Sequence, residues 1–205
     1  SMVLPTFDIE KELLTQGFQL VAGVDEVGRG SWVGPVVAGA VILPLELELP
    51  PLLRDSKMLS AAQREKMDVW VRQVAKGVGI GEVELAVINK VGIGEATHLA
   101  FRRALRALKL KPDFVIIDAL YIKKLKQSLQ KPVPAGDKVC ASIAAASIVA
   151  KVYRDKILTD LHPEFPEYNW AQNKGYGTAA HRQAIRDHGF TPYHRKSFDL
   201  AYLST

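Results

Sequence analysis

Residues 18–43 read FQLVAGVDEVGRGSWVGPVVAGAVIL, and this stretch decides the fold. Two runs rich in valine, isoleucine and alanine, residues 18–27 and 33–43, lie on either side of a Gly-Arg-Gly turn at residues 28–30. Apolar, β-branched runs that flank a glycine turn predict two neighbouring strands. The sheet of this protein is therefore expected to begin here.

Further along the chain, strands alternate with helices. Polar, proline-containing residues 119–136 predict a loop. Strands that are first neighbours and later alternate with helices predict an α/β domain with a mixed sheet flanked by helices. The composition changes after Pro163, which predicts a main domain over residues 1–160 and a small helical appendage over 161–205. By hydrophobic periodicity and turn residues, helices are expected over 7–16, 60–76, 94–109, 140–158 and 178–188, with further strands near 77–81 and over 114–117.

The overall composition excludes several protein classes. The chain has 205 residues, of which 48% are hydrophobic and 24% charged, which excludes a disordered, collagen-like or coiled-coil chain. No apolar run reaches the roughly 18 residues needed to span a bilayer, and the N-terminus has no signal-peptide pattern. The single cysteine, Cys140, excludes an intrachain disulfide and fits a reducing compartment. We therefore expect a cytoplasmic protein with no membrane partner.

The positive charge is concentrated in one stretch of the chain. The net charge is +5, but residues 101–140 hold 10 basic and 3 acidic side chains, a local charge of +7. A local excess of this kind is expected for a protein that binds a polyanion such as nucleic acid. The alternative is a solvated helix face followed by a lysine-rich loop. We call these residues the basic block: Arg102, Arg103, Arg106, Lys109, Lys111, Lys123, Lys124, Lys126, Lys131 and Lys138.

Acidic residues stand where apolar segments meet polar sequence. Asp25 and Glu26 lie inside the first strand, Asp118 ends the strand 114–117, and Asp137 precedes the long helix. Buried carboxylates need a partner or a metal ion, and oxygen ligands without a Cys/His cluster suit Mg²⁺ or Mn²⁺. Two such ions about 4 Å apart clamp the attacking and leaving oxygens in phosphodiester cleavage. The alternatives are separate salt bridges and, for Asp137, a helix cap.

Two points about these acids remain open from the residues alone. Adjacent residues of a strand point to opposite faces, so Asp25 and Glu26 serve one site only at a strand edge, or with one acting through backbone or water. Asp155 competes with Asp137 for the fourth position. If one helix joined Asp137 to Asp155, they would stand about 27 Å apart and could not share a site. We prefer Asp137.

Three short motifs offer groups for a phosphate or sugar. The acidic pair is followed by Val27 and then by Gly28, Arg29 and Gly30. Glycine lets the backbone approach a ligand closely, and arginine can form two parallel hydrogen bonds to a phosphate. Ser56 and Lys57 precede a helix and present a hydroxyl and an ammonium; the alternative is a helix entry with a solvated lysine. Tyr176 lies between two glycines, where it can stack on a base or sugar or contact a 2′-hydroxyl. No histidine has zinc-site spacing with Cys140, which is expected to be a small packing residue.

These residues and others, in the same order from about residue 20 to 198, resemble bacterial ribonuclease HII. The resemblance begins with Ala22-Gly23-Val24-Asp25-Glu26-Val27-Gly28-Arg29-Gly30 and Gly34-Pro35-Val36. The Gly-Arg-Gly form argues against the sister ribonuclease HIII type. The further matches are Asp55-Ser56-Lys57, Ile117-Asp118, residues 142–148 (SIAAASI), Ala150-Lys151, Arg154-Asp155, residues 173–178 (NKGYGT) and residues 194–198 (HRKSF).

The resemblance implies an RNase H-like fold with a small helical C-terminal part that contributes to substrate binding. It implies a metal-dependent endoribonuclease that hydrolyses the RNA strand of RNA·DNA hybrids. It also implies incision 5′ of single ribonucleotides in duplex DNA, leaving 3′-hydroxyl and 5′-phosphate ends. By motif matching, the metal-binding acids are Asp25, Glu26, Asp118 and Asp137, and the group that detects the 2′-hydroxyl is Gly28, Arg29, Gly30 and Tyr176.

The chain departs from the family pattern in places that leave the four acids intact. Ala119 stands where many members have glycine, and Asn89 and Gly92 replace an acid and an asparagine. No clamp-binding motif is evident near the C-terminus, so recruitment to a replication clamp is not expected. We expect a monomer with no clear protein partner. The rival interpretations are another RNase H-like nuclease, such as a junction resolvase, and a non-catalytic hybrid-binding protein.

Overall fold

The computed structural model describes residues 2–204, and its centre is one mixed five-stranded sheet. The strands follow the order β3-β2-β1-β4-β5. Their bounds are β1 Val21–Val27, β2 Val36–Ile42, β3 Gly77–Val83, β4 Phe114–Asp118 and β5 Gln130–Val133. The helices are α1 Asp8–Thr15, α2 Ala61–Val74, α3 Leu85–Val91, α4 Ile93–Ala107, α5 Gly136–Val139, α6 Ala141–Leu161, α7 Trp170–Asn173 and α8 Ala179–His188. The predicted mixed sheet flanked by helices is confirmed.

Pairing around the central strand β1 aligns two of the acidic residues. β1 pairs antiparallel with β2 and parallel with β4, and Val24 lies opposite Ile117 in the parallel pair. The next residues along the two strands are Asp25 and Asp118. Residues in register on neighbouring parallel strands point to the same face, so these two carboxylates start side by side.

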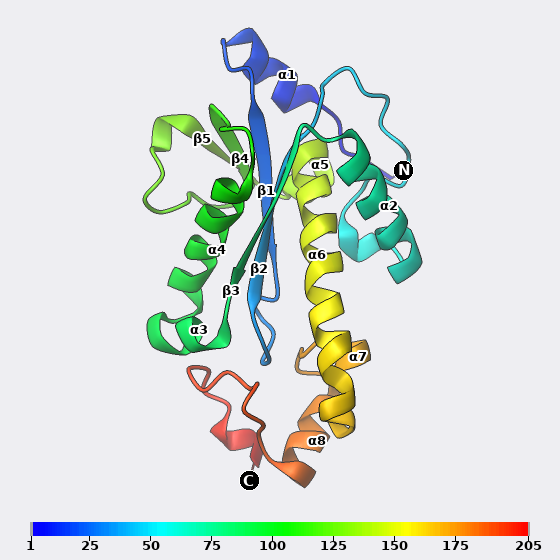
Figure 1. Ribbon diagram of the computed structural model, residues 1–205, viewed down its shortest axis with the longest axis vertical. Helices are drawn as coiled ribbons and strands as arrows, with labels where there is room; N and C mark the ends of the chain where they lie inside the picture. The colour runs from blue at the N-terminus through cyan, green and yellow to red at the C-terminus, as the bar shows by residue number, and fades with distance from the viewer. Residues whose placement is uncertain (1, 205) are drawn as a thin grey trace.

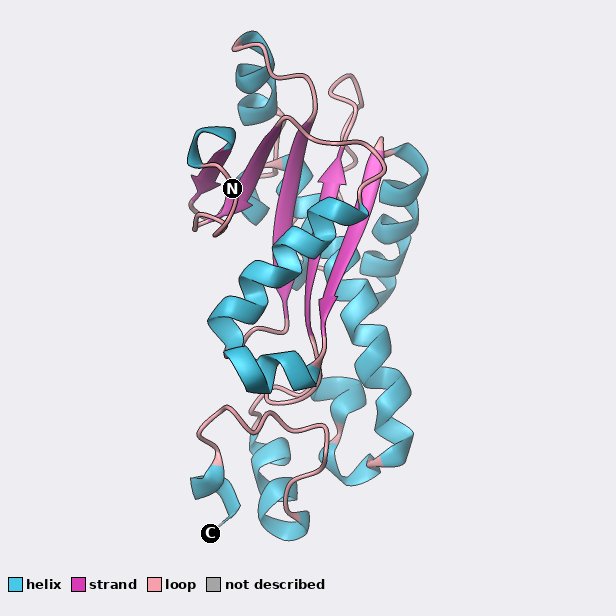
Figure 2. Cartoon of the chain, turned by 60° about the vertical axis from the view of Figure 1, so that its left-hand side comes forward, coloured by secondary structure: helices cyan, strands magenta, loops and turns pink. Residues whose placement is uncertain are grey.

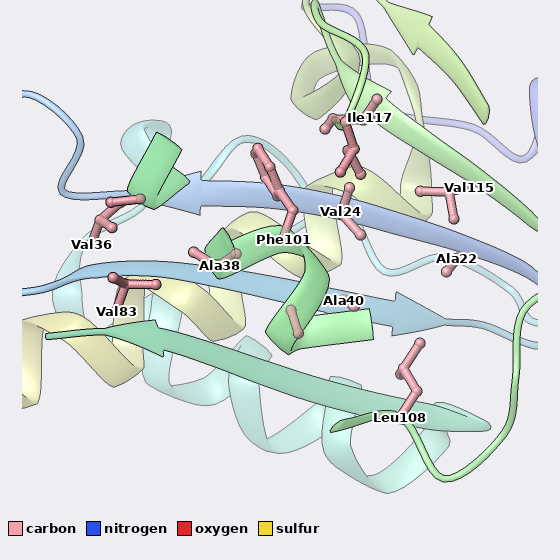
Figure 3. Packing of buried hydrophobic residues seen from close by; sticks show 14 of the residues in the cluster. Ala22, Val24, Val36, Ala38, Ala40, Val83, Phe101, Leu108, Val115 and Ile117 are labelled. Carbon is pink, nitrogen blue, oxygen red and sulfur yellow. The ribbon is translucent and has the colours of Figure 1, made fainter. Parts of the chain in front are cut away.

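The sheet lies between two helical layers. Figures 1 and 2 show α4 and α3 over one face and the long helix α6, with α2 beside it, over the other. The α4 side is packed by alternate residues of the strands, among them Val24, Ala38 and Ile117, against Phe101 of α4 (Figure 3). Because alternate strand residues face opposite sides, the neighbours of these apolar residues, including Asp25 and Asp118, face the α6 side.

Glycines in β3 let α4 lie very close to the sheet. A Cβ atom added to Gly79 would stand 2.1 Å from the carbonyl oxygen of Ala104, and one added to Gly81 would stand 2.1 Å from that of Ala100. Real side chains cannot tolerate contacts this short, so larger residues at these positions would push the helix away. The glycines that punctuate this segment are therefore a packing requirement.

The chain bends between α5 and α6, beside the strands β1 and β4 that carry Asp25 and Asp118. Cys140 is extended, with φ −109° and ψ 124°, and it separates the two helices. The N-terminus of α6 has no side-chain cap of its own, but Glu10 of α1 accepts hydrogen bonds from the Ser142 backbone N–H (3.1 Å) and hydroxyl (2.9 Å). A carboxylate at this position satisfies free N–H groups and favours the helix dipole. Cys140 is fully buried, as its predicted packing role requires, and burial raises the pKa of its thiol to about 12.

Most predicted elements are present, but two parts of the prediction are wrong. Residues 119–136 are not only a loop, because they contain β5, which pairs with β4 at the edge of the sheet. Pro132 lies in this strand, and an edge position tolerates a missing backbone donor. The buried Gln130 side chain closes the preceding turn by bonding the backbone of Ile122 and Leu125. Helix α3 was also not expected.

The C-terminal segment beyond α6 folds around its own apolar cluster. Tyr168, Trp170, Ile185 and Leu203 pack there, and Val33 and Leu158 extend the cluster toward the main sheet. Figure 1 shows this segment beyond the ends of β1 and β2, with α7 and α8 next to the C-terminal end of α6. The position brings residues 173–178 close to the turn that follows β1 (residues 28–30). No helix between residues 2 and 204 is both long and apolar enough to cross a membrane.

Candidate active site

Three acidic side chains meet beside β1. One carboxylate oxygen from each of Asp25, Asp118 and Asp137 lies within 4.8 Å of the other two. Asp25 and Asp118 come from neighbouring parallel strands, and Asp137 comes from α5, which lies next to them just before α6. Asp137 caps neither α5 nor α6, so the helix-cap alternative for this residue is wrong. The geometry instead gathers three hard oxygen donors at one point.

Glu26 lies next to this cluster but is not one of the three. It follows Asp25 on β1, its backbone N–H donates to Asp25 Oδ1 at 2.9 Å, and its side chain interacts with the Asp25 side chain. Glu26 lines the same cavity as the three aspartates, one residue before the end of β1. The two adjacent acids thus lie beside one cavity although they are neighbours on a strand.

The cluster concentrates negative charge where the carboxylates of Asp25 and Asp137 are largely buried from solvent. Burial, and then the neighbouring charges of Glu26 and Asp137, raise the pKa of Asp25 well above its usual value. Burial, followed by Asp55 and Asp118, also raises the pKa of Asp137, while Lys57 works in the opposite direction. Mutual repulsion of this kind is what a bound cation relieves.

The basic side chain of Lys57 faces the cluster. Lys57 Nζ lies 3.9 Å from Asp137 Oδ2. Burial acts to lower the pKa of Lys57, but the carboxylates of Asp55, Asp137, Asp25 and Asp118 together raise it. Lys57 therefore stays protonated beside the acids, and its position at the rim suits contact with a phosphate.

Asp155 takes no part in the cluster. Its carboxylate pairs with Lys151 (2.8 Å) and Arg64 (3.6 Å) between α6 and α2. The single helix that would have set Asp137 and Asp155 about 27 Å apart does not exist, because the chain bends at Cys140. The preference for Asp137 agrees with its place in the cluster.

The turn after β1 and the loop around Tyr176 lie against each other. The Gly28 backbone N–H donates to the Tyr176 hydroxyl at 3.1 Å, and the Trp32 backbone N–H donates to the Gly175 carbonyl at 2.9 Å. Gly28 needs its lack of a side chain, because its φ is +84° and an added Cβ would stand 2.1 Å from Arg154 Nε. Residues far apart in the sequence therefore form one surface beside the acids.

Two buried histidines, His181 and His194, contact each other, and His181 contacts the backbone of Tyr176. His181 Nδ1 lies 2.9 Å from the Tyr176 carbonyl, His181 Nε2 lies 3.0 Å from His194 Nε2, and the Thr191 backbone N–H donates to His194 Nδ1 at 2.9 Å. These contacts are all satisfied when both rings are neutral, with the proton of His181 on Nδ1 and that of His194 on Nε2. Burial lowers the pKa of both rings, that of His194 to about 4, which keeps them neutral.

The residues predicted for the site line a single cavity of about 440 Å³. Ser147 and Lys151, one turn apart on α6, also line it, and sequence reasoning missed both as site residues. Their spacing of four residues puts them on one helix face, which is the signal that could have found them. The ten predicted residues in the lining are Asp25, Glu26, Gly28, Arg29, Gly30, Ser56, Lys57, Asp118, Asp137 and Tyr176.

The three departures from the family pattern each have a local place. Ala119 follows Asp118 with φ +68°, a left-handed conformation that glycine adopts without strain. Gly92 joins α3 to α4 with φ +85°, a backbone conformation that residues with a side chain rarely adopt. The Asn89 side chain accepts a hydrogen bond from the Ser197 backbone N–H at 3.1 Å, which ties α3 to the C-terminal segment.

The basic block divides into paired and exposed members. The Arg103 side chain donates to the Glu82 carbonyl and pairs with Glu84, and Lys123 pairs with Glu95. The exposed members include Lys124, Lys126, Lys131 and Lys138, which lie in the segment between Asp118 and α6. The solvated-face alternative thus applies to part of the block, and the remainder flanks the acids along the chain.

Comparison with known proteins identifies relatives over nearly the whole chain. Residues 22–201 match the family model described as ribonuclease HII. A ribonuclease HII from Desulfitobacterium hafniense (strain DSM 10664 / DCB-2) is 48% identical over 189 residues, covering 92% of this chain and 72% of that protein. A ribonuclease HII from Syntrophus aciditrophicus (strain SB) is 47% identical over 191 residues, covering 93% of this chain and 89% of that protein.

A solved structure shares the fold. The crystal structure of the ribonuclease H2 from Pyrococcus horikoshii OT3 superimposes with a TM-score of 0.74 and covers 91% of this chain and 97% of that chain. Its sequence identity of 24% makes this a likeness of fold alone. The expected RNase H-like fold, a mixed sheet flanked by helices with a small helical C-terminal part, is confirmed.

Proposed function

The chain belongs to the ribonuclease HII family, and from this premise we propose that the acidic cluster beside β1 is the active site of a metal-dependent endoribonuclease. The substrate is the RNA strand of RNA·DNA hybrids and the single ribonucleotide embedded in duplex DNA. The observation that carries the proposal is the meeting of Asp25, Asp118 and Asp137 within 4.8 Å, in a cavity that Tyr176 also lines. The products are 3′-hydroxyl and 5′-phosphate ends.

The residues of the cluster fit divalent cations. All of its donors are carboxylate oxygens, the ligands that Mg²⁺ and Mn²⁺ prefer over nitrogen or sulfur. The raised pKa of Asp25, due first to burial, marks a place where negative charge lacks compensation. We propose that Asp25, Glu26, Asp118 and Asp137 hold two such ions. When bound, the ions supply a water of lowered pKa and stabilise charge on the leaving 3′-oxygen.

The chain's own residues perform the positioning. Asp25 is held by its hydrogen bond from the Glu26 N–H and by its place inside the sheet, so its carboxylate is fixed before substrate binds. Asp118 Oδ1 accepts from the Gly136 N–H at 3.3 Å, which links β4 to the helix that carries Asp137. Rigid elements that fix reactive groups in advance lower the cost of reaching the transition state. Lys57 at the rim would orient the phosphate beside the acids.

Recognition of the ribonucleotide is assigned to the turn at residues 28–30 together with Tyr176. The Tyr176 hydroxyl and the Gly28 N–H are already bonded to each other, so this surface is ordered without substrate. A tyrosine ring on such a surface can stack on a sugar, and only RNA offers a 2′-hydroxyl for the adjacent polar groups. Arg29 and Ser56, which line the same cavity, complete the contacts to the backbone.

The basic block supports binding of the rest of the duplex. Its exposed members Lys124, Lys126 and Lys131 lie in the segment that joins Asp118 to Asp137, and Lys138 follows directly, so they flank the acids along the chain. Phosphate contacts release counterions, so binding should weaken as salt rises.

The test is cleavage of an end-labelled DNA duplex that carries one ribonucleotide, with Mg²⁺ or Mn²⁺ present. The proposal predicts a single cut on the 5′ side of the ribonucleotide and none in an all-DNA duplex. Tyr176→Phe removes the hydroxyl and should reduce this cut about tenfold, while the matched control Tyr121→Phe, at an exposed tyrosine, should not. Equal cutting of the all-DNA duplex would contradict the recognition of a 2′-hydroxyl and favour a resolvase-like nuclease. Binding without cleavage would favour a non-catalytic protein.

A further inference from the structure

Two arginines lie fully inside the protein behind the turn at residues 28–30. Arg154 of α6 is 0% exposed and Arg195 of the C-terminal segment is 1% exposed. Within residues 2–204, neither guanidinium forms an ion pair with a carboxylate. Buried charge without a counter-ion is costly, so a pair of such arginines requires an explanation.

Every hydrogen bond from these arginines goes to a backbone carbonyl of two loops. Arg154 donates from Nε to Pro35 (2.9 Å), from Nη2 to Val33 (2.7 Å) and from Nη1 to Lys174 (2.8 Å). Arg195 donates from Nη2 to Gly28 (2.6 Å) and from Nη1 to Arg29 (2.9 Å), with further bonds to Gly34 and Pro35. The acceptors therefore lie in residues 28–35, after β1, and at the start of the Tyr176 loop.

These bonds set the direction of two N–H groups. A trans peptide points its C=O and the N–H of the next residue in opposite directions. Because Arg195 holds the carbonyls of Gly28 and Arg29, the N–H groups of Arg29 and Gly30 point away from it. In the described part of the chain neither N–H has a protein partner, and both residues line the cavity. The loop therefore presents two adjacent free donors beside the acids.

We propose that Arg154 and Arg195 are positioning residues for recognition of the ribonucleotide. Arg195 orients the N–H groups of Arg29 and Gly30 into the cavity, and Arg154 joins the 28–35 loop to the loop that carries Tyr176. The planar guanidinium suits this task because it offers five donors in a fixed geometry, whereas lysine offers one flexible ammonium. This inference rests on the proposed function of the cavity.

The alternative role is structural only, and the two roles predict different results. A single ribonucleotide offers one productive register and one 2′-hydroxyl, so its incision depends on exact loop geometry. A continuous RNA·DNA hybrid offers a 2′-hydroxyl at every register and tolerates a looser loop. A displaced recognition loop should therefore affect the first substrate most, whereas a loss of folded protein lowers both activities equally.

The experiment compares Arg195→Lys and Arg154→Lys with the matched control Arg186→Lys, at an exposed arginine of α8. Specific activities are measured on the single-ribonucleotide duplex and on a continuous hybrid. We expect Arg195→Lys to lower kcat/KM on the single ribonucleotide at least tenfold more than on the hybrid, since small misplacements cost up to about 100-fold. An equal loss on both substrates, or no loss, would overturn the proposal.

Amide hydrogen exchange without substrate provides a readout that does not depend on activity. Arg195→Lys should accelerate exchange in residues 28–35 and 174–178 and leave the strands of the sheet unchanged. Unchanged exchange in these loops would overturn the positioning role even if wild-type protein cuts as proposed. If wild-type protein does not cut at ribonucleotides, the proposed function fails, and exchange still decides the role of the arginines. Failure of both lysine variants to fold cooperatively would make the arginines fold determinants and would also overturn the proposal.

Discussion

Replacing Asp25 by asparagine should abolish activity and at the same time stabilise the protein in the absence of metal. Asparagine has the same shape and keeps an oxygen that accepts the Glu26 N–H, so the change removes mainly the charge. Two unit charges at the 4.8 Å limit of this cluster repel by about 3.5 kcal/mol at an effective dielectric constant of 20. Asp25 faces two such neighbours, Asp118 and Asp137, and the adjacent Glu26 adds to the repulsion. Partial protonation and relaxation reduce the effect.

We therefore expect Asp25→Asn to raise the free energy of unfolding by about 1–3 kcal/mol at pH 8 with a chelator present. For a chain of this length that corresponds to a rise in Tm of about 2–12 °C. Cleavage should fall to about one hundredth or less, because loss of even an outer-shell partner of a metal costs 10–100-fold.

The measurements are thermal unfolding and cleavage of a single-ribonucleotide duplex. Glu48→Gln is the control, since it removes the same charge from an exposed loop and should change stability by less than about 0.5 kcal/mol. A metal-free Asp25→Asn protein that is less stable than wild type would refute the reasoning that repulsion dominates this cluster.

Three further predictions concern residues around the site. Ala119→Gly should raise the free energy of unfolding by about 0.5–1 kcal/mol, measured by urea titration, because alanine is strained at φ +68°; a lower midpoint would contradict this. Asp155→Asn should cost about 1–3 kcal/mol in the same titration yet retain cleavage, whereas Asp137→Asn should lose cleavage, and the reverse pattern would exchange their roles. The histidine pair should make stability depend on pH: the pKa of His194 falls from the ordinary 6.5 to about 4 on folding, so the unfolded chain binds the proton first as pH drops. Stability should therefore fall by on the order of 3 kcal/mol between pH 6.5 and 4, and a His194→Gln protein that kept the full dependence would contradict the assignment.

The elements found from the sequence are those whose signal is local. The apolar run of β1 ends at Gly28, that of β2 ends before Pro44, and that of β4 ends at Asp118. The expected helix that starts at residue 60 is likewise determined locally, since Ser60 and Gln63 form a capping box at the start of α2. Where neighbouring residues alone determine the structure, sequence reasoning was sufficient.

The elements that sequence reasoning missed depend on partners far along the chain. β5 forms because β4 supplies an edge and because Gln130 bonds the preceding turn, so its own polar, proline-containing sequence gives no sign of a strand. Arg154 follows the pattern of an ordinary helical arginine. Its burial follows only from carbonyls of residues 33, 35 and 174, which the fold brings to it. The bend at Cys140, which delivers Asp137 to the other acids, was not evident for the same reason.

The central claim is that the acidic cluster beside β1 hydrolyses a nucleic acid strand next to a ribonucleotide with the help of divalent cations. The most direct measurement maps the products from a duplex with one ribonucleotide, with Mg²⁺ or Mn²⁺ and with a chelator. The account predicts one metal-dependent cut on the 5′ side of the ribonucleotide that leaves a 3′-hydroxyl, and no cut with Asp25→Asn. A cut that persists in the chelator, or that Asp25→Asn retains, would contradict it.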